Sequence, residues 1–170
     1  MLPNIDLRIS NIIKAMEQVL LPALPADQRL ARDQAMLIIG QLSMIADQWK
    51  HAAAYERLTL DDLRGLATQL LPAAQGPAKD ALTQQIAATD NCDANDVDAL
   101  ESANIALGRA VDAVILGDDG THDLPAECVE AILAYGDRHA RAERIWFKGN
   151  RLDPDQKDLP EIEELLAEGS

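Results

Sequence analysis

His139 and Glu143 are the residues whose types and spacing best fit acid–base chemistry. Residues four apart lie on one side of a helix, so Glu143 can accept a hydrogen bond from the imidazole of His139 and stabilise its protonated form. Asn104 lies in the apolar stripe of its own predicted helix and can supply a third polar group, although nothing in the sequence places it near His139. The alternatives are that the helix extends beyond the core and leaves the pair in water, or that the pair is structural.

A row of basic side chains offers a second kind of site. Arg141, Arg144 and Lys148 follow one another at intervals of three and four residues, so they form a stripe if one helix carries them all. Such a row can bind a phosphate, a carboxylate or an acidic peptide. An anionic small molecule is therefore one candidate ligand. The alternative is that the row forms ion pairs with acidic residues of the same chain.

Motifs for metals, cofactors and common catalytic sites are absent from the sequence. It contains no phosphate-binding loop, no dinucleotide fingerprint, and no HExxH or GxSxG motif. A di-iron bundle needs Glu-x-x-His on two helices, and no Glu-x-x-His occurs. The acidic segment 93–98 lacks the glycine of a calcium loop, and Cys92 and Cys128 match no metal or redox spacing. We therefore predict neither a metal nor a cofactor.

The charge of the chain limits its partners and its location. Fifteen basic and 29 acidic residues give a formal net charge of -14, which disfavours nucleic acids and anionic membranes. The most apolar stretch, residues 35–46, is too short to span a membrane. The opening sequence lacks the pattern of a secretory signal, and two distant cysteines fit a reducing compartment. We therefore expect a cytoplasmic protein.

Composition and apolar periodicity predict an all-α fold. Hydrophobic residues make up 48% of the 170 residues, mostly as Ala, Leu, Ile and Val, whereas aromatic residues make up 3%. No segment alternates apolar and polar residues as a half-buried strand does. We predict an antiparallel up-down bundle of about four long helices, at roughly residues 4–21, 27–58, 96–116 and 125–148. Two short connecting helices are expected at roughly residues 60–71 and 77–88.

The helix expected at residues 27–58 has the most regular pattern. Its apolar residues keep a strict spacing of four and three, at Ala31, Ala35, Ile38, Leu42, Ile45, Trp49 and Ala52. The pattern predicts that Ile38, Leu42 and Ile45 are buried. This helix is longer and more broadly apolar than its neighbours can cover, so we expect a two-fold homodimer that uses it or the last long helix.

Residues 1–150 are expected to form a single helical-bundle domain, followed by an acidic tail at residues 151–170 that can form one short helix. The tail after Arg151 carries seven acidic residues and a single lysine, directly after the basic row. We expect the tail to fold back so that Glu161, Glu163 or Glu164 lies near that row. Exposed ion pairs are individually weak, so Ile162 and Leu165 are expected to anchor the tail on Trp146 or Phe147.

The missing motifs and the wide apolar faces favour a non-catalytic interaction or accessory protein, whose partner is a second copy or another protein. The alternative is a small-molecule-binding protein or enzyme with a site between the last two long helices, around His139 and Glu143. An exposed, self-complementary apolar patch favours the first function, and a closed pocket around the two residues favours the second.

Overall fold

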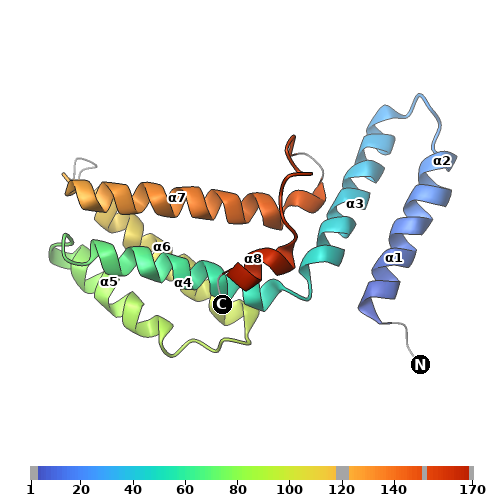
Figure 1. Ribbon diagram of the computed structural model, residues 1–170. Helices are drawn as coiled ribbons and strands as arrows, with labels where there is room; N and C mark the ends of the chain where they lie inside the picture. The colour runs from blue at the N-terminus through green and yellow to red at the C-terminus, as the bar shows by residue number, and fades with distance from the viewer. Residues whose placement is uncertain (1–3, 118–122, 151–152, 169–170) are drawn as a thin grey trace. The chain divides into compact units, whose positions relative to one another are not determined.

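The structure is all-α, as the composition and periodicity predict. It is a computed structural model that describes residues 4–117, 123–150 and 153–168, and no strand occurs in these three ranges. Its helices are joined by short turns and loops (Figure 1). Within the described ranges, no helix combines the length and the apolar character that a membrane span requires.

The chain divides into two compact units. The first contains Met1–His51 and Glu143–Leu165, and the second contains Ala52–Ala142 and Leu166–Ser170. The long helix α7 (Ala126–Trp146) contributes its last four residues to the first unit and the remainder to the second.

The first unit begins with α1 (Ile5–Ala15). The side chain of Asn4 caps this helix by accepting a hydrogen bond from the amide of Leu7 at 2.9 Å. The helix then continues through a π-helical turn (Met16–Leu20) into the short α2 (Leu21–Ala23).

Arg32 fixes the connection between α2 and α3 (Arg29–Gln48). Its guanidinium donates to the backbone carbonyls of Leu21 and Leu24, both at 3.2 Å. Carbonyls at the end of a helix lack partners within the helix, so this contact stabilises the turn. As a result α1 and α3 lie side by side and run in opposite directions (Figure 1). We call residues 5–48 the α1–α3 hairpin.

The prediction of one continuous helix over residues 27–58 is wrong, because α3 ends at Gln48 and α4 (Ala52–Leu70) begins after a tight turn. The indole of Trp49 donates to the carboxylate of Asp6 at 3.0 Å, and the ammonium of Lys50 contacts the same carboxylate at 2.6 Å. These bonds attach the turn to α1. Since Asp6 is remote in sequence, the local periodicity contains no sign of the break.

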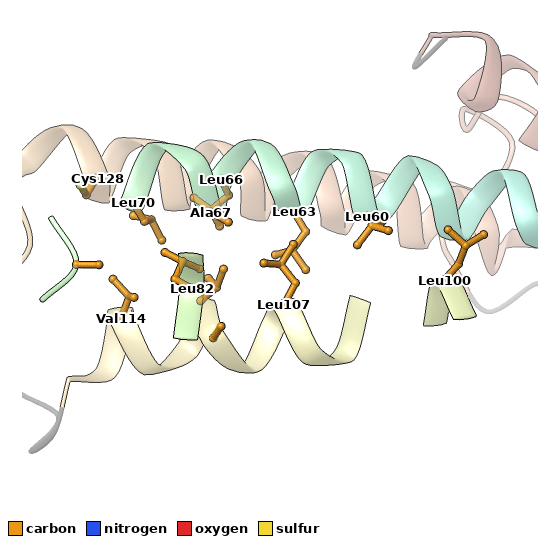
Figure 2. Packing of buried hydrophobic residues seen from close by; sticks show 13 residues of the cluster. Leu60, Leu63, Leu66, Ala67, Leu70, Leu82, Leu100, Leu107, Val114 and Cys128 are labelled. Carbon is orange, nitrogen blue, oxygen red and sulfur yellow. The ribbon is translucent and has the colours of Figure 1, made fainter. Parts of the chain in front are cut away.

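The second unit packs four helices around one core, with successive helices running in opposite directions (Figure 1). These are α4, α5 (Gly76–Thr89), α6 (Val97–Leu116) and the first part of α7. Their buried residues form one cluster, shown in Figure 2: Leu60, Leu63, Leu66, Ala67, Leu70, Ala74, Leu82, Leu100, Leu107, Ala110, Val111, Val114 and Cys128. The helices expected at 77–88, 96–116 and 125–148 correspond closely to α5, α6 and α7.

Local chemistry at both ends explains the limits of α6. The carboxylate of Asp96 accepts hydrogen bonds from the amides of Asp98 and Ala99, at 3.0 and 3.2 Å, and so caps the N-terminus. Gly117 follows the last helical residue with φ of 64°, a left-handed conformation that favours glycine and stops the helix.

The burial predicted for α3 is wrong at two of three positions. Ile38 and Ile45 are exposed, at 48% and 47%, and Leu42 is half-buried. The residues that α3 buries are Ala35, Ile39 and Met44. Met44 lies beside the short 3-10 turn Lys148–Asn150. Within this unit the apolar stripe of α3 is therefore covered only in part.

Candidate functional site

The two units divide the predicted acid–base pair between them. His139 belongs to the second unit, where its half-buried ring stacks on Tyr135 with the ring centroids 5.4 Å apart. Glu143 is the first residue of the α7 segment that belongs to the first unit, and it is exposed.

Asn104 links two helices of the second unit. Its amide nitrogen, on α6, lies 3.0 Å from the backbone oxygen of Glu56, 2.9 Å from the carboxylate of Glu56 and 3.2 Å from the hydroxyl of Thr59, both on α4. A polar residue inside an apolar stripe is accounted for when it is hydrogen-bonded in this way. These contacts give Asn104 a structural role between α4 and α6.

Arg144 binds the beginning of the acidic C-terminal region. Its Nε donates to one carboxylate oxygen of Asp153 at 2.7 Å, and its NH2 donates to the other at 3.1 Å and to Asp155 at 3.2 Å. This two-point geometry is the strong form of an arginine–carboxylate contact. The guanidinium of Arg144, together with the backbone N–H of Asp155, holds the pKa of Asp153 below its ordinary value.

Lys148 binds the next part of the same region. Its ammonium donates to the backbone carbonyls of Leu159 and Pro160, at 3.2 and 3.1 Å, and to the carboxylate of Glu161 at 2.6 Å. An ammonium has three donors, so these three acceptors saturate it. The contact with Glu161 confirms one of the pairings expected for the tail, whereas Glu163 lies 3.2 Å from the imidazole of His51.

Arg141, the third member of the basic row, belongs to the second unit. It donates to both carboxylate oxygens of Glu168, at 2.8 and 3.3 Å. This hydrogen bond, and then the charge of Arg141, lower the pKa of Glu168. Each cation predicted to form an anion site therefore has a carboxylate partner within its own chain.

Two apolar side chains anchor the C-terminal region. Ile162 and Leu165, on α8 (Ile162–Glu168), are only 6% and 5% exposed. Ile162 lines a small cavity of about 120 Å³ together with Ile145 and Trp146. The predicted contact with Trp146 is confirmed for Ile162, and Leu165 is buried as expected of an anchor. We call residues 153–165 the C-terminal segment.

One side of the α1–α3 hairpin is polar and lines a larger cavity of about 650 Å³. Lys148, Gly149, Gln156 and Lys157 form its other wall. The hairpin contributes Asp6, Ser10, Ile13, Lys14, Glu17, Ser43, Ala46 and Asp47. Both signs of charge are present, so the cavity has no clear preference for one charge. Among the described residues, no group of three or more His, Cys, Asp or Glu side chains is arranged to hold a metal ion.

Exposed apolar side chains are concentrated on the hairpin. Ten of the sixteen large apolar side chains that are exposed in the described part of the chain lie on the hairpin: Ile5, Leu7, Ile12, Val19, Leu20, Leu30, Met36, Leu37, Ile38 and Ile45. Single exposed apolar residues are common, but a contiguous group marks an interaction surface. The sequence contained this signal as the spacing of four and three, yet the pattern does not tell which half of the stripe is covered.

Two regular rows stand out in this group. In the first helix, Ile5, Ile12 and Val19 are exposed, whereas Ile9, three residues before Ile12, is buried. In α3, Ile38 and Ile45 are exposed. We call these five residues the apolar face.

Comparison of the chain with known protein families, with curated proteins and with solved structures finds no match.

Proposed function

We propose that this protein is a non-catalytic interaction protein that associates with a second copy of itself through the apolar face of the α1–α3 hairpin. The observation that carries the proposal is the half-covered apolar stripe on both helices of the hairpin. A spacing of four and three is typical of helices that pack against neighbours on two sides.

Helix geometry places both exposed rows on one side of the hairpin. In each helix an exposed member of the row lies three residues after a buried residue, Ile12 after Ile9 in α1 and Ile38 after Ala35 in α3. Three residues correspond to about 300° of rotation, so the row lies about 60° away from the covered position. Because the two helices run in opposite directions, equal rotations bring both rows to the same side, opposite the polar cavity.

A second hairpin supplies the surface that this face lacks. It carries the same two rows, so a two-fold axis brings identical apolar faces together and completes a four-helix arrangement. The charge supports this partner. Residues 4–48 carry five acidic and four basic side chains, whereas the whole chain has a net charge of -14. Two copies therefore meet at a nearly neutral region, where mutual repulsion is small.

Cytoplasmic location also remains part of the proposal. Cys92 and Cys128 are both free thiols, which is consistent with a reducing compartment. The strong negative charge disfavours nucleic acids and anionic membranes as partners. A protein surface is therefore the partner class that the chemistry favours.

Sedimentation equilibrium of the full chain tests the proposal. We expect a dimer at micromolar concentration for the natural chain and a monomer for Ile38→Glu, because the new carboxylate would be desolvated in the interface. The matched control is Leu133→Glu on α7, where the natural side chain is 65% exposed and lies outside the hairpin. This variant stays a dimer. A monomeric mass for the natural chain at high micromolar concentration contradicts the proposal.

A further inference from the structure

We infer that the last turn of α7 carries a binding site for an acidic peptide with two aliphatic anchors, and that the C-terminal segment occupies this site within its own chain. An acidic, helix-forming segment of another protein is the partner that such a site fits. The inference does not depend on self-association, because the site and the apolar face use different residues.

The site recognises its occupant through charge at two points. Arg144 holds the carboxylate of Asp153 with two hydrogen bonds, and Lys148 holds Glu161 at 2.6 Å. The other two contacts of Lys148 do not select a sequence, because it donates there to the backbone carbonyls of Leu159 and Pro160. A partner peptide therefore needs acidic side chains at two places and an ordinary backbone between them.

The apolar contacts select a peptide rather than a small anion. Ile162 and Leu165 are three residues apart on α8 and are almost completely buried. Ile145, which is fully buried, and Trp146 line the same small cavity as Ile162. A free phosphate can satisfy Arg144 but cannot fill this apolar surface. The site thus matches an amphipathic helical segment with an i, i+3 anchor pair.

The C-terminal segment depends on its docking site for its helical structure. Helix α8 has only seven residues, which is too short to be stable alone in water, so it forms only when it is docked. Two of the segment's paired carboxylates are exposed, Glu161 and Asp155 each at 66%, whereas Asp153 is 15% exposed. Exposed pairs are individually weak and are screened by salt.

Covalent linkage explains why the site is filled. A segment joined to its site by a short connection is present at an effective concentration of about millimolar. A separate partner must therefore bind more tightly than the C-terminal segment, or be held nearby by another contact. The C-terminal segment consequently acts as a built-in competitor that restricts access to the site.

Peptide binding to the full chain tests this inference. The probe is a fluorescently labelled peptide of residues 153–168, and its binding is measured by anisotropy. The protein is the full-length Ile162→Asp, Leu165→Asp variant, whose own segment lacks its anchors. We expect this variant to bind the peptide about tenfold or more tightly than the natural chain, in which the segment competes.

Charge reversal provides the matched controls. Lys148→Glu in the anchor variant removes peptide binding, and a peptide carrying Glu161→Lys restores it. A merely structural role for Lys148 does not produce such a rescue. A peptide with both anchors replaced by Asp does not bind. If the folded anchor variant fails to bind the natural peptide, the inference is overturned.

Hydrogen exchange of the natural chain covers the case in which the anchor variant does not fold. We expect amides of the C-terminal segment to exchange faster than those of the core helix α6, and faster again when unlabelled peptide is added in excess. If the segment exchanges only together with α6, and the peptide does not change its exchange, the segment is an inseparable part of the fold. This result overturns the inference. Neither outcome depends on the mass of the protein, so a failure of this inference does not contradict the proposed dimer.

Discussion

Gly149 shows how a single residue fixes the short turn after α7 against α3. A Cβ atom at this position would lie 2.9 Å from a carboxylate oxygen of Asp47 and 3.4 Å from the Cα of Met44. The first contact is with the end of the Asp47 side chain, which would have to turn away, and the second is an ordinary van der Waals contact. A larger residue at this position therefore requires the side chain of Asp47 to move.

We expect Gly149→Ala to lower the free energy of unfolding by about 1 kcal/mol, because the added methyl group displaces the side chain of Asp47. Gly136→Ala is the matched control, because nothing lies within 4 Å of the added methyl group on the exposed side of α7. In a helix interior that change stabilises by about 0.5–1 kcal/mol. Urea unfolding of both variants measures the two effects, and an equal shift for both contradicts the close packing at Gly149.

The carboxylates of Asp153 and Glu168 give the molecule a defined dependence on pH. The pKa of each lies below its ordinary value, mainly because Arg144 hydrogen-bonds to Asp153 and Arg141 to Glu168. A lowered pKa in the folded state means that the carboxylate stabilises the fold when it is ionised. This stabilisation is complete above the unfolded pKa of about 4 and is lost as the pH falls through the folded pKa.

We therefore expect tryptophan emission, which reports on Trp146 beside Ile162 and on Trp49 beside Asp6, to stay constant from about pH 7 to pH 5 and to change below about pH 4. Asp153→Asn removes one of the two contributions. The difference in stability between this variant and the natural chain should be full at neutral pH and should shrink in acid. A difference that grows as the pH falls contradicts the assignment.

At the scale of elements, periodicity predicted the helices well but not their limits or their orientation. The existence of α5, α6 and α7 followed from their apolar spacing, because each packs one face on a shared core. The break between α3 and α4 could not be predicted, since it depends on Asp6 bonding to Trp49 and Lys50. That contact joins residues more than forty positions apart.

Some contacts of the candidate sites could be predicted from the sequence, and others could not. Charge alternation along the chain indicated that acidic residues would meet the basic row, and Lys148 does contact Glu161. Residue spacing placed His139 and Glu143 on one helix, as α7 confirms, but could not show that the helix is shared between two units. The polar role of Asn104 was also hidden, because its partner Glu56 lies on another helix.

Substitutions at two adjacent residues of α3 can distinguish burial within the chain from burial against a second copy. Ile39 is 8% exposed and Ile38 is 48% exposed. We expect Ile39→Ala to cost about 2–5 kcal/mol at any protein concentration, because it leaves a cavity inside the hairpin. Ile38→Ala should cost less than about 0.5 kcal/mol at nanomolar concentration, where the chain is a monomer, and more at high concentration.

Thermal melts over a wide concentration range measure this difference. If Ile38→Ala has the same small effect at every concentration, Ile38 does not lie in an interface. If Ile39→Ala has no effect, the hairpin does not pack as the structure shows.

At the scale of the whole molecule, salt should act in opposite directions on the two proposed interactions. In the proposed dimer the apolar face would join two copies that each carry a net charge of -14, so screening should reduce their mutual repulsion and strengthen association. The C-terminal segment instead depends on attraction between Lys148 or Arg144 and acidic partners, which the same screening weakens.

We therefore expect the dimer dissociation constant to fall when NaCl is raised from about 0.05 M to about 0.5 M, as the Debye length shortens from more than 10 Å to less than 5 Å. Over the same range, the anchor variant should bind the labelled peptide more weakly. Sedimentation and anisotropy in one set of buffers compare the two directly. Weaker association at high salt would mean that ion pairs, and not the apolar face, join the two copies. Peptide binding that is insensitive to salt would mean that the aliphatic anchors alone hold the peptide, without the contacts of Arg144 and Lys148.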